Sequence, residues 1–534
     1  MHRILVADKL SDEGLALLRA APDIEFIVRT EWPGETLAAA VAEAEGVIVR
    51  SAVRLTAKEL AAPGRLRAIA RAGVGVDTID VEAATRAGVL VMNTPDANTL
   101  STAEQAWALM LALSRHTVAA CNHVREGGWQ RGKYQGAQLA GKTLGVVGLG
   151  RIGRAVAQRA LAFEMNVLAF DPLYRGATAL EDRVKLVGSL GALFAGSDYV
   201  SLHAALTDAS RGMINADVLA QARPGLRLVN CARGDLVDEA ALADALRAGR
   251  LAGAAVDVYS VEPPPKDHPL LSLPQVVCTP HLGASTAEAQ SAVSVEAAQA
   301  MLDYLLRGEV RGAVNLADLP SSMSPRDRAF ADLASRMGRL LNGLCPGGVE
   351  QIAITTFGDG LAALAPALRR FAVASLLGPF FENRLTIVNA DAAARDHGID
   401  VRCISRPEPR GVTDHLLLGA SGGGRQHEIE ATVFVDGLPR LMRIDGYPMN
   451  LTAAGDLVLI VNDDRPGVIG LVGTVFGKHR VNIADMALSR HAQRALMVLK
   501  LDAPPPPECL RELERHDAIL SIHLTSLPAA PPSA

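Results

Sequence analysis

The sequence KTLGVVGLGRIG at residues 142–153 places a glycine-rich turn directly after an apolar strand. Thr143–Val147 forms the strand, and Arg154–Phe163 has the composition of a helix. A second apolar run, Asn166–Phe170, ends at Asp171, 18 residues after the last glycine of the turn. A G-x-G-x-x-G turn between strand and helix, with an acid at the end of the next strand, predicts a dinucleotide-binding unit.

Each part of the turn has its own task. Gly148 permits the tight turn, Gly150 lets the backbone approach a pyrophosphate, and Gly153 lets the helix pack on the sheet. The amides of Arg151 and Ile152 are expected to face the phosphates at the helix N-terminus, where the helix dipole favours negative charge.

Asp171 indicates which dinucleotide is bound. Its carboxylate is expected to accept hydrogen bonds from the ribose hydroxyls and to repel a 2′-phosphate, which favours NAD over NADP. The competing interpretation is a structural glycine turn followed by a capping aspartate.

Further strand ends carry groups suited to oxidising a 2-hydroxy acid, which needs a cation for the carboxylate and a base for the hydroxyl proton. Arg233 follows the strand Leu226–Val229 and can hold a carboxylate bidentately. Ligands bind at this end of the strands in an open α/β sheet. The alternative is a surface arginine that pairs with Asp235.

The predicted base is His281, which follows the strand Val276–Cys278. Glu262 is expected to orient His281 and to stabilise its imidazolium form, and Asp257 also follows a strand. The alternative is that His281 caps a helix and Glu262 is solvated. His203 lies at another strand end and competes for the role of base, although no carboxylate neighbours it in the sequence.

The remainder of the first 316 residues alternates short strands with helices, which is typical of parallel α/β sheets. The expected strands are Ile4–Val6, Ile24–Val28, Val47–Val49 and Leu66–Ala70, and the expected helices are Glu13–Ala20, Glu35–Ala44, Ser101–His116 with Ser101 or Thr102 as its cap, and Thr286–Arg307.

The pattern changes near Leu319–Pro325, which is predicted to be a linker. In the segment beyond it, Gly422–Gly424 is expected to be a flexible loop. Glu428–Val435 and Arg440–Ile444 flank Asp436-Gly437, which predicts a hairpin. The last eighty residues predict a βαββαβ order, and the tail from Pro528 is expected to be disordered.

Composition excludes several classes. The chain has 534 residues, 49% hydrophobic and 21% charged, with a formal charge of −5, so neither nucleic acid nor an anionic membrane is an expected partner. The six cysteines show no CxxC or zinc spacing, so we expect no metal and a reduced, cytoplasmic protein. The N-terminus does not resemble a signal peptide, and no apolar run is long enough to predict a membrane span.

Four motifs together resemble the D-2-hydroxyacid dehydrogenase family in order and spacing: Gly148–Gly153, Asn230–Gly234, Asp257–Pro263 and Thr279–Thr286. The resemblance implies Arg233, Glu262 and His281 as the catalytic set. It implies further cofactor contacts at His203, Cys231, Ala232, Arg233, Asp257, His281, Gly283 and Ala284. One departure is Ala204, because family members commonly have a threonine there that touches the cofactor.

Two further features are similar to the long form of this family. In Arg71–Asp77 the amides of Val74 and Gly75 would meet the substrate carboxylate. Asp463–Gly467 with Val481–Ile483 resembles an ACT domain, a small amino-acid-sensing fold.

This resemblance implies an effector site made by Asn462, Asp464 and Asn482. Some relatives have a histidine or tyrosine at the position of Asn462, which puts the affinity for serine in question.

The resemblance implies that the substrate is 3-phosphoglycerate, oxidised with NAD at the entry to L-serine synthesis, with L-serine as effector. Arg50 and Arg71 are expected to touch the substrate, and Arg54 is a further candidate cation. Arg131 and Lys133 are also candidates and would act by reaching a neighbouring subunit. The long form is expected to be a homodimer or homotetramer, because ACT domains pair edge to edge.

The resulting expectation is an α/β protein with two doubly wound, Rossmann-like or flavodoxin-like parallel-sheet domains, an α+β intervening domain and a βαββαβ ACT domain. The expected boundaries are 1–99 with 285–316 for substrate, 100–284 for NAD, 317–451 for the intervening domain and 452–534 for the ACT domain. Two other functions stay open: a reductase of unphosphorylated 2-oxo acids such as glyoxylate or hydroxypyruvate, and an NAD-binding regulator of dehydrogenase fold.

Overall fold

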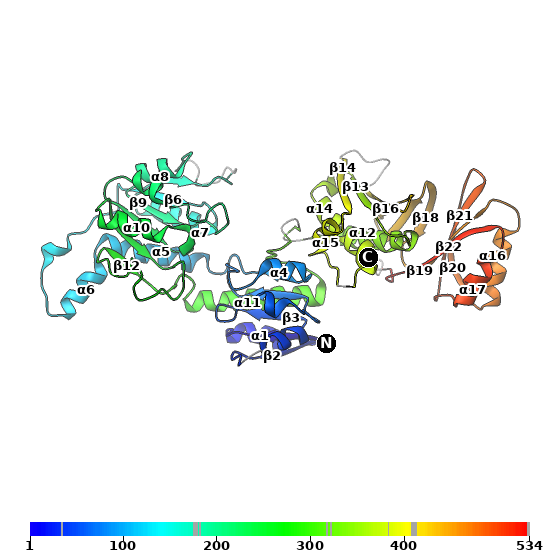
Figure 1. Cartoon of the computed structure of the whole chain (residues 1–534), viewed down its shortest axis with the longest axis horizontal. Helices are drawn as coiled ribbons and strands as arrows, with labels where there is room; N and C mark the ends of the chain where they lie inside the picture. Colours follow the sequence, from blue (N-terminus) through cyan, green and yellow to red (C-terminus); the bar gives the residue numbers. More distant parts are fainter. Residues whose placement is uncertain are drawn as a thin grey trace.

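Four β-sheets follow one another along the chain in the computed structural model (Figure 1). The structure describes residues 1–33, 36–174, 180, 183–316, 319–320, 323–382, 384–406 and 414–530. Within these residues, no helix combines the length and the apolar character that crossing a membrane would require.

The first sheet is parallel, with the strand order β2-β1-β3-β4-β5. Helices cover both faces, which explains why its strands are almost continuously apolar. Its strands are β1 (His2–Val6), β2 (Ile24–Val28), β3 (Gly46–Val49), β4 (Ala68–Arg71) and β5 (Leu90–Met92). One face packs on α1 (Asp12–Ala20) and α11 (Ala287–Arg307), and the other on α2 (Thr36–Glu43), α3 (Ala57–Leu60) and α4 (Val81–Arg86).

The second sheet is also parallel, in the order β12-β11-β10-β9-β6-β7-β8. The order reverses direction between β6 and β9, which is where ligands bind in sheets of this kind. Its strands are β6 (Thr143–Val147), β7 (Asn166–Phe170), β8 (Val184–Leu186), β9 (Tyr199–Leu202), β10 (Leu226–Asn230), β11 (Leu251–Val256) and β12 (Val276–Cys278). The covering helices are α5 (Thr99–Ser114) and α7 (Arg151–Ala162) on one face, with α8 (Leu190–Gly196), α9 (Ala216–Ala220) and α10 (Glu239–Arg247) on the other.

Helices α5 and α11 connect these two units. The expected cap of α5 is wrong: the helix starts after Asn98, whose side chain makes no capping bond. The hydroxyls of Ser101 and Thr102 instead donate to the carbonyl of Gly283, at 2.7 and 3.2 Å. The first turn of α5 therefore holds the loop that follows β12.

The third sheet is mixed, in the order β14-β13-β15-β16-β17-β18. Gly422–Gly424 is not a loose loop: Gly422 pairs with Arg425, and Gly423 and Gly424 form the hairpin turn with φ of +56° and +75°. The hairpin predicted at Asp436-Gly437 is confirmed. The strands are β13 (Gln351–Phe357), β14 (Asp400–Arg406), β15 (His415–Gly422), β16 (Arg425–Val433), β17 (Pro439–Ile444) and β18 (Tyr447–Thr452), with α12 (Pro325–Leu344), α13 (Asp359–Ala362), α14 (Ala365–Leu377) and α15 (Ala390–Asp396).

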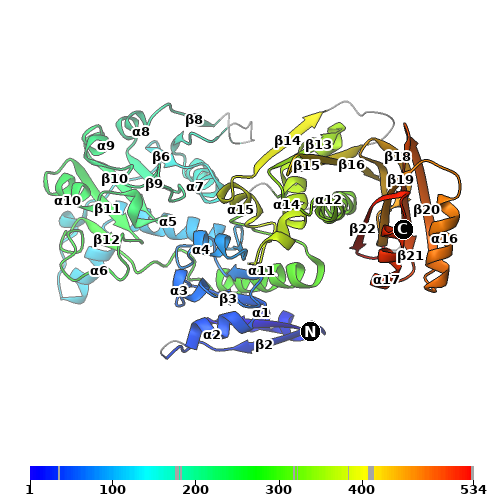
Figure 2. The same cartoon turned by 45° about the vertical axis from the view of Figure 1, so that its right-hand side comes forward.

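The fourth sheet is antiparallel, in the order β20-β21-β19-β22, and confirms the predicted βαββαβ order. One face packs on its own helices and the other on α12, so α12 lies between the third and fourth sheets (Figure 2). Its elements are β19 (Gly455–Asp463), α16 (Val468–Lys478), β20 (Ile483–His491), β21 (Arg494–Leu501), α17 (Pro507–Glu514) and β22 (Ile519–Leu527).

Polar contacts from side chains to backbone carbonyls fix this C-terminal half. The expectation of a disordered tail is wrong at its start, because the Arg336 guanidinium on α12 binds the carbonyls of Pro528 and Ala529 at 2.7 and 3.0 Å. Residues 531–534 lie outside the described part, as do 321–322 of the predicted linker. Thr386 donates to the carbonyl of Gly88 in the first unit, at 3.0 Å.

Candidate functional site

Two glycines of the turn after β6 lie too close to the neighbouring backbone to carry a side chain. Gly148 has φ of +89°, and a Cβ there would lie 2.8 Å from the carbonyl oxygen of His203. A Cβ on Gly153 would lie 1.9 Å from the carbonyl oxygen of Gly148, so helix α7 can start only with glycine at this position. Gly150 faces open space, which leaves its backbone accessible to a phosphate. The Arg151 side chain forms an ion pair with Asp96 of the first unit.

Asp171 directly follows β7, beside this turn. Its Oδ2 accepts the Leu149 amide at 2.8 Å, and its Oδ1 accepts the Leu173 amide at 2.9 Å. These bonds fix the carboxylate at the position where a ribose would meet it, and each oxygen keeps a further lone pair for a hydroxyl donor.

His203 follows β9 and does not have the setting of a base. Its Nε2 lies 2.8 Å from the Ser201 hydroxyl, and its Nδ1 is buried without a hydrogen-bond partner. Desolvation lowers the pKa of His203 to about 4, so its ring is neutral at pH 7.

His281 is paired as the sequence predicted. Its Nδ1 lies 2.8 Å from Glu262 Oε2, and both side chains are partly exposed, at 46% and 37%. The other carboxylate oxygen of Glu262 accepts the Tyr259 amide at 3.1 Å, which fixes the acid. The pair leaves Nε2 of the imidazole free to face a ligand, and His281 itself has a left-handed φ of +56°.

Asp257 lies buried beneath the loop that carries His281. It is 1% exposed, and its carboxylate accepts the Thr279 hydroxyl at 2.6 Å and the amides of Leu282 and Gly283 at 2.8 and 2.9 Å. A buried carboxylate with this many donors holds the loop that carries His281. Gln105 of α5 lies within 3.4 Å of the same carboxylate.

The strands β10, β11 and β12 bring these groups to one edge. Asn230, Val256 and Cys278 are in register, so the residues that follow them leave the sheet side by side. The Asn230 side chain accepts the Ala232 amide at 3.0 Å and donates to the Arg233 carbonyl at 2.9 Å, which shapes the turn carrying Arg233. Cys231 is buried, and burial raises the pKa of its thiol.

Arg233 meets the first unit. Its Nε donates to Asp77 Oδ2 at 3.0 Å and its Nη1 donates to the Ala232 carbonyl at 2.7 Å. The alternative partner, Asp235, binds Arg211 instead, at 2.7 Å.

Arg71 lies in the same cation cluster. Desolvation, the charge of Arg233 and the charge of Arg50 lower its pKa to about 10, while Asp77 raises it. Arg71 Nε donates to the carbonyl of Arg50 at 3.3 Å, and the guanidinium groups of Arg71 and Arg233 lie against Gly73 and Gly75 of the same loop.

Other predicted residues are not brought to this cluster. Arg131 and Lys133 lie on a 3-10 turn (Arg131–Tyr134) after α6 (Thr117–Arg125), in an arm that projects from the second unit (Figure 1). Arg54 is exposed in the loop after β3.

The three predicted effector residues are not one cluster within the chain. Asn462 is 3% exposed near the end of β19, and Asp464 binds Arg490 at 2.7 Å. Asn482 binds Asp502 at 2.6 Å. The register pairs Asp456 with Leu501 and Asp463 with Arg494, so Asn482 lies at the opposite end of the sheet from Asp464.

Family models match three parts of the chain. Residues 107–283 match the NAD binding domain of D-isomer specific 2-hydroxyacid dehydrogenases, 327–445 match the D-3-phosphoglycerate dehydrogenase intervening domain, and 457–518 match the ACT domain. Curated proteins named D-3-phosphoglycerate dehydrogenase match along the whole length. The one from Archaeoglobus fulgidus is 38% identical over 97% of this chain and 98% of that protein. The chain belongs to the D-3-phosphoglycerate dehydrogenase family.

Further members and solved structures agree with this placement. The Bacillus subtilis D-3-phosphoglycerate dehydrogenase is 34% identical over 99% of this chain and all of that protein. The structure of the TT0316 protein from Thermus thermophilus has a TM-score of 0.53 at 36% identity and covers 58% of this chain and 99% of that one. A glyoxylate reductase from Paecilomyes thermophila has a TM-score of 0.54 at 31% identity, covering 59% and 98%. The family and the turn geometry together indicate a nicotinamide cofactor.

Sequence reasoning missed two parts of the site. It gave Asp77 no role, although this acid lies in the quoted loop and binds Arg233. It also missed Thr279 and Gln105, whose polar side chains meet at buried Asp257. The only signal in the sequence was a threonine directly after an apolar strand, which is too common to be informative.

Proposed function

We propose that this chain oxidises D-3-phosphoglycerate to 3-phosphohydroxypyruvate with NAD, the first step of L-serine synthesis. The observation that carries the proposal is the pairing of His281 with Glu262 at 2.8 Å, at the sheet edge that also positions Arg233. The full-length relatives that share the name D-3-phosphoglycerate dehydrogenase support the choice of substrate.

Each of the three proposed catalytic residues has a separate role. His281 accepts the proton of the substrate hydroxyl at Nε2, because its Nδ1 faces Glu262. Glu262 keeps the imidazole oriented and stabilises its charged form. Arg233 holds the carboxylate through the Nη1–Nη2 edge of its guanidinium, which its bond to Asp77 leaves open. The bound nicotinamide supplies the acceptor for the hydride.

The loop amides of Val74 and Gly75 complete the carboxylate site in this proposal. Arg71 and Arg50 neutralise the remaining negative charge of the substrate, and burial together with the charges of Arg233 and Arg50 lowers the pKa of Arg71. Arg131 and Lys133 of the arm are not proposed as ligands of the substrate phosphate within the same chain.

The cofactor is held by the turn Gly148–Gly153 and by Asp171, and we propose NAD. A 2′-phosphate would place negative charge against the Asp171 carboxylate, whose two oxygens are fixed by the amides of Leu149 and Leu173. Further contacts are proposed from His203, Cys231, Ala232, Asp257, Gly283 and Ala284.

The proposed domains are a substrate domain of residues 1–99 with 285–316, an NAD domain of 100–284, an intervening domain of 317–451 and an ACT domain of 452–534.

L-serine is the proposed effector, bound by Asn462, Asp464 and Asn482. Because Asp464 and Asn482 lie at opposite ends of one sheet, this site needs two chains paired in an antiparallel sense along a sheet edge. Such a pair brings the two ends together.

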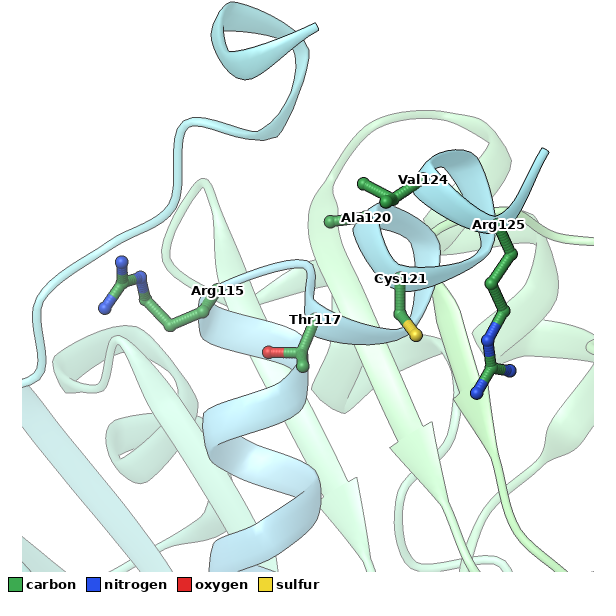
Figure 3. A pocket seen from close by; sticks show the side chains of 6 residues that line it. All are labelled: Arg115, Thr117, Ala120, Cys121, Val124 and Arg125. Carbon is green, nitrogen blue, oxygen red and sulfur yellow. The ribbon is translucent and has the colours of Figure 1, made fainter. Parts of the chain in front are cut away.

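The arm supports the proposal of a homo-oligomer. Helix α6 has no buried residue, and Val124 and Trp129 are 53% and 76% exposed. An open hollow on this arm is lined by both polar and apolar side chains (Figure 3). The lining residues are Arg115, Thr117, Ala120, Cys121, Val124 and Arg125. Light scattering of the purified protein tests this proposal, and a monomer at micromolar concentration would contradict it.

One assay tests the proposed function. NADH formation from NAD should be rapid with D-3-phosphoglycerate, at least about 100-fold slower with D-glycerate, and much slower with NADP. L-serine should lower the rate. Preference for the unphosphorylated acid would favour a glyoxylate or hydroxypyruvate reductase, and NAD binding without turnover of either acid would favour a regulator. Insensitivity to serine would remove only the effector proposal.

A further inference from the structure

The Arg233 guanidinium is held on two sides, and only one of its partners is in its own unit. Nη1 binds the neighbouring Ala232 carbonyl, while Nε binds Asp77, which lies 156 residues away in the loop after β4. The Arg233 side chain is 27% exposed and that of Asp77 is 55% exposed. The carboxylate therefore holds an arginine that is largely enclosed by the protein.

The loop of Asp77 is shaped to receive this arginine. A Cβ on Gly75 would lie 1.7 Å from Arg233 Nη2 and 2.6 Å from Asp77 Oδ2. No side chain fits at this position while the ion pair exists, although the φ of Gly75 is not in the left-handed region. Gly75 is thus required for a close approach of Nη2 to the backbone.

Asp77 is the acid that offsets the positive charge of the arginines around this contact. Arg71, Arg233 and Arg50 lie near one another, and the mutual repulsion contributes to the lowered pKa of Arg71. Asp8 is the other acid that acts on Arg71, but it is 7% exposed and accepts the amides of Lys9 and Ala52. Asp77 alone among these acids makes a direct bond to Arg233.

The bond between Arg233 Nε and Asp77 leaves other donors of the guanidinium for a substrate carboxylate. An arginine has five N–H donors in a fixed planar fork. Asp77 uses Nε and Ala232 uses one hydrogen of Nη1, so both hydrogens of Nη2 and one of Nη1 have no partner among the residues that the structure describes. Nη2 and the remaining N–H of Nη1 are therefore the donors left for a carboxylate.

We propose that Asp77 is a positioning residue that turns this edge of Arg233 toward the substrate carboxylate. This role rests on the proposed function, because it assumes that Arg233 binds a 2-hydroxy acid. Asp77 belongs to the first unit and Arg233 to the second, so Asp77 orients Arg233 when the two units are in contact.

The test compares Asp77→Asn with Asp96→Asn. Both changes remove an acid that forms an ion pair between the first and second units, but only Asp77 binds Arg233. We expect Asp77→Asn to raise the KM for D-3-phosphoglycerate about 10-fold, the cost of weakening one charged hydrogen bond. The kcat should change less than about 3-fold and the KM for NAD should stay constant. Asp96→Asn should leave the KM for the substrate within about 2-fold of the parent.

Three results would overturn the role of Asp77. An unchanged KM in Asp77→Asn means that Arg233 is oriented without it. A lower KM means that Asp77 competes with the substrate for Arg233. An equal rise in Asp96→Asn assigns the effect to contact between the units. If the parent protein turns over a different 2-hydroxy acid, the same comparison is made with that acid, so failure of the proposed substrate and failure of the Asp77 role remain distinguishable.

Discussion

Replacing His281 with alanine should lower kcat by about 1,000-fold while NADH binding stays near the parent value. General base catalysis contributes about 100- to 10,000-fold, and His281 is the imidazole that the structure pairs with a carboxylate at the edge of β10, β11 and β12. The side chain is 46% exposed, so its removal leaves no cavity in the core. Steady-state rates and NADH fluorescence titration measure the two quantities separately.

Glu262→Gln should lower kcat by about 10- to 100-fold, less than His281→Ala, because the amide still fills the space but no longer stabilises an imidazolium.

His203→Gln tests the competing base. His203 is neutral, binds Ser201 and has no carboxylate partner in the described structure, so its loss should reduce kcat far less than the loss of His281. A mutant series in which His203→Gln is inactive and His281→Ala retains more than a tenth of kcat would reverse the assignment.

The local parts of this site could be predicted from the sequence because strand ends and glycine turns have short-range signatures. The turn Gly148–Gly153, the acid Asp171 and the pair of Glu262 with His281 all follow apolar strands whose carboxyl ends meet at one edge. Parallel strands make this inference reliable, since each crossover returns the chain to the same side of the sheet.

Contacts between units have no such signature. Asp77 and Arg233 are 156 residues apart, and Asp235 lies much closer in sequence to Arg233 yet binds Arg211. Asp257 follows a strand as the other site residues do, and no sequence pattern showed that its buried carboxylate also holds the loop of His281. The caps assigned to Ser101 and Thr102 failed for the same reason, because a tertiary partner at Gly283 takes their hydroxyls.

The second large effect is expected from Arg336, which no sequence pattern identified. This side chain is 3% exposed on α12 and donates to the carbonyl of Ala453 at 2.9 Å, where the chain enters β19. It also binds the carbonyls of Pro528 and Ala529, where the chain leaves β22. One guanidinium therefore holds both ends of the C-terminal sheet unit against the helix that this unit shares with the third sheet.

Arg336→Met should destabilise this attachment by about 3 kcal/mol, because three charge-assisted hydrogen bonds are lost and the buried carbonyl of Ala453 no longer receives the Arg336 donor. Methionine keeps most of the side-chain volume, so the loss is mainly polar. Hydrogen exchange is the appropriate measurement, since unfolding of a multidomain chain is not two-state. The amides of Leu457–Val461 should exchange about 100-fold faster, which is the factor that about 3 kcal/mol allows when opening of this unit limits exchange.

The matched control is Arg339→Met, which removes an exposed arginine one turn further along the same helix. It should leave exchange in β19 unchanged. Strand β19 also packs on α12 through Leu457 and Leu459, so loss of the Arg336 bonds weakens a contact that covers one face of this strand. Serine sensitivity should then weaken together with protection, while turnover of the substrate without serine persists. Unchanged protection of Leu457–Val461 would mean that apolar packing on α12 alone holds the sheet in place.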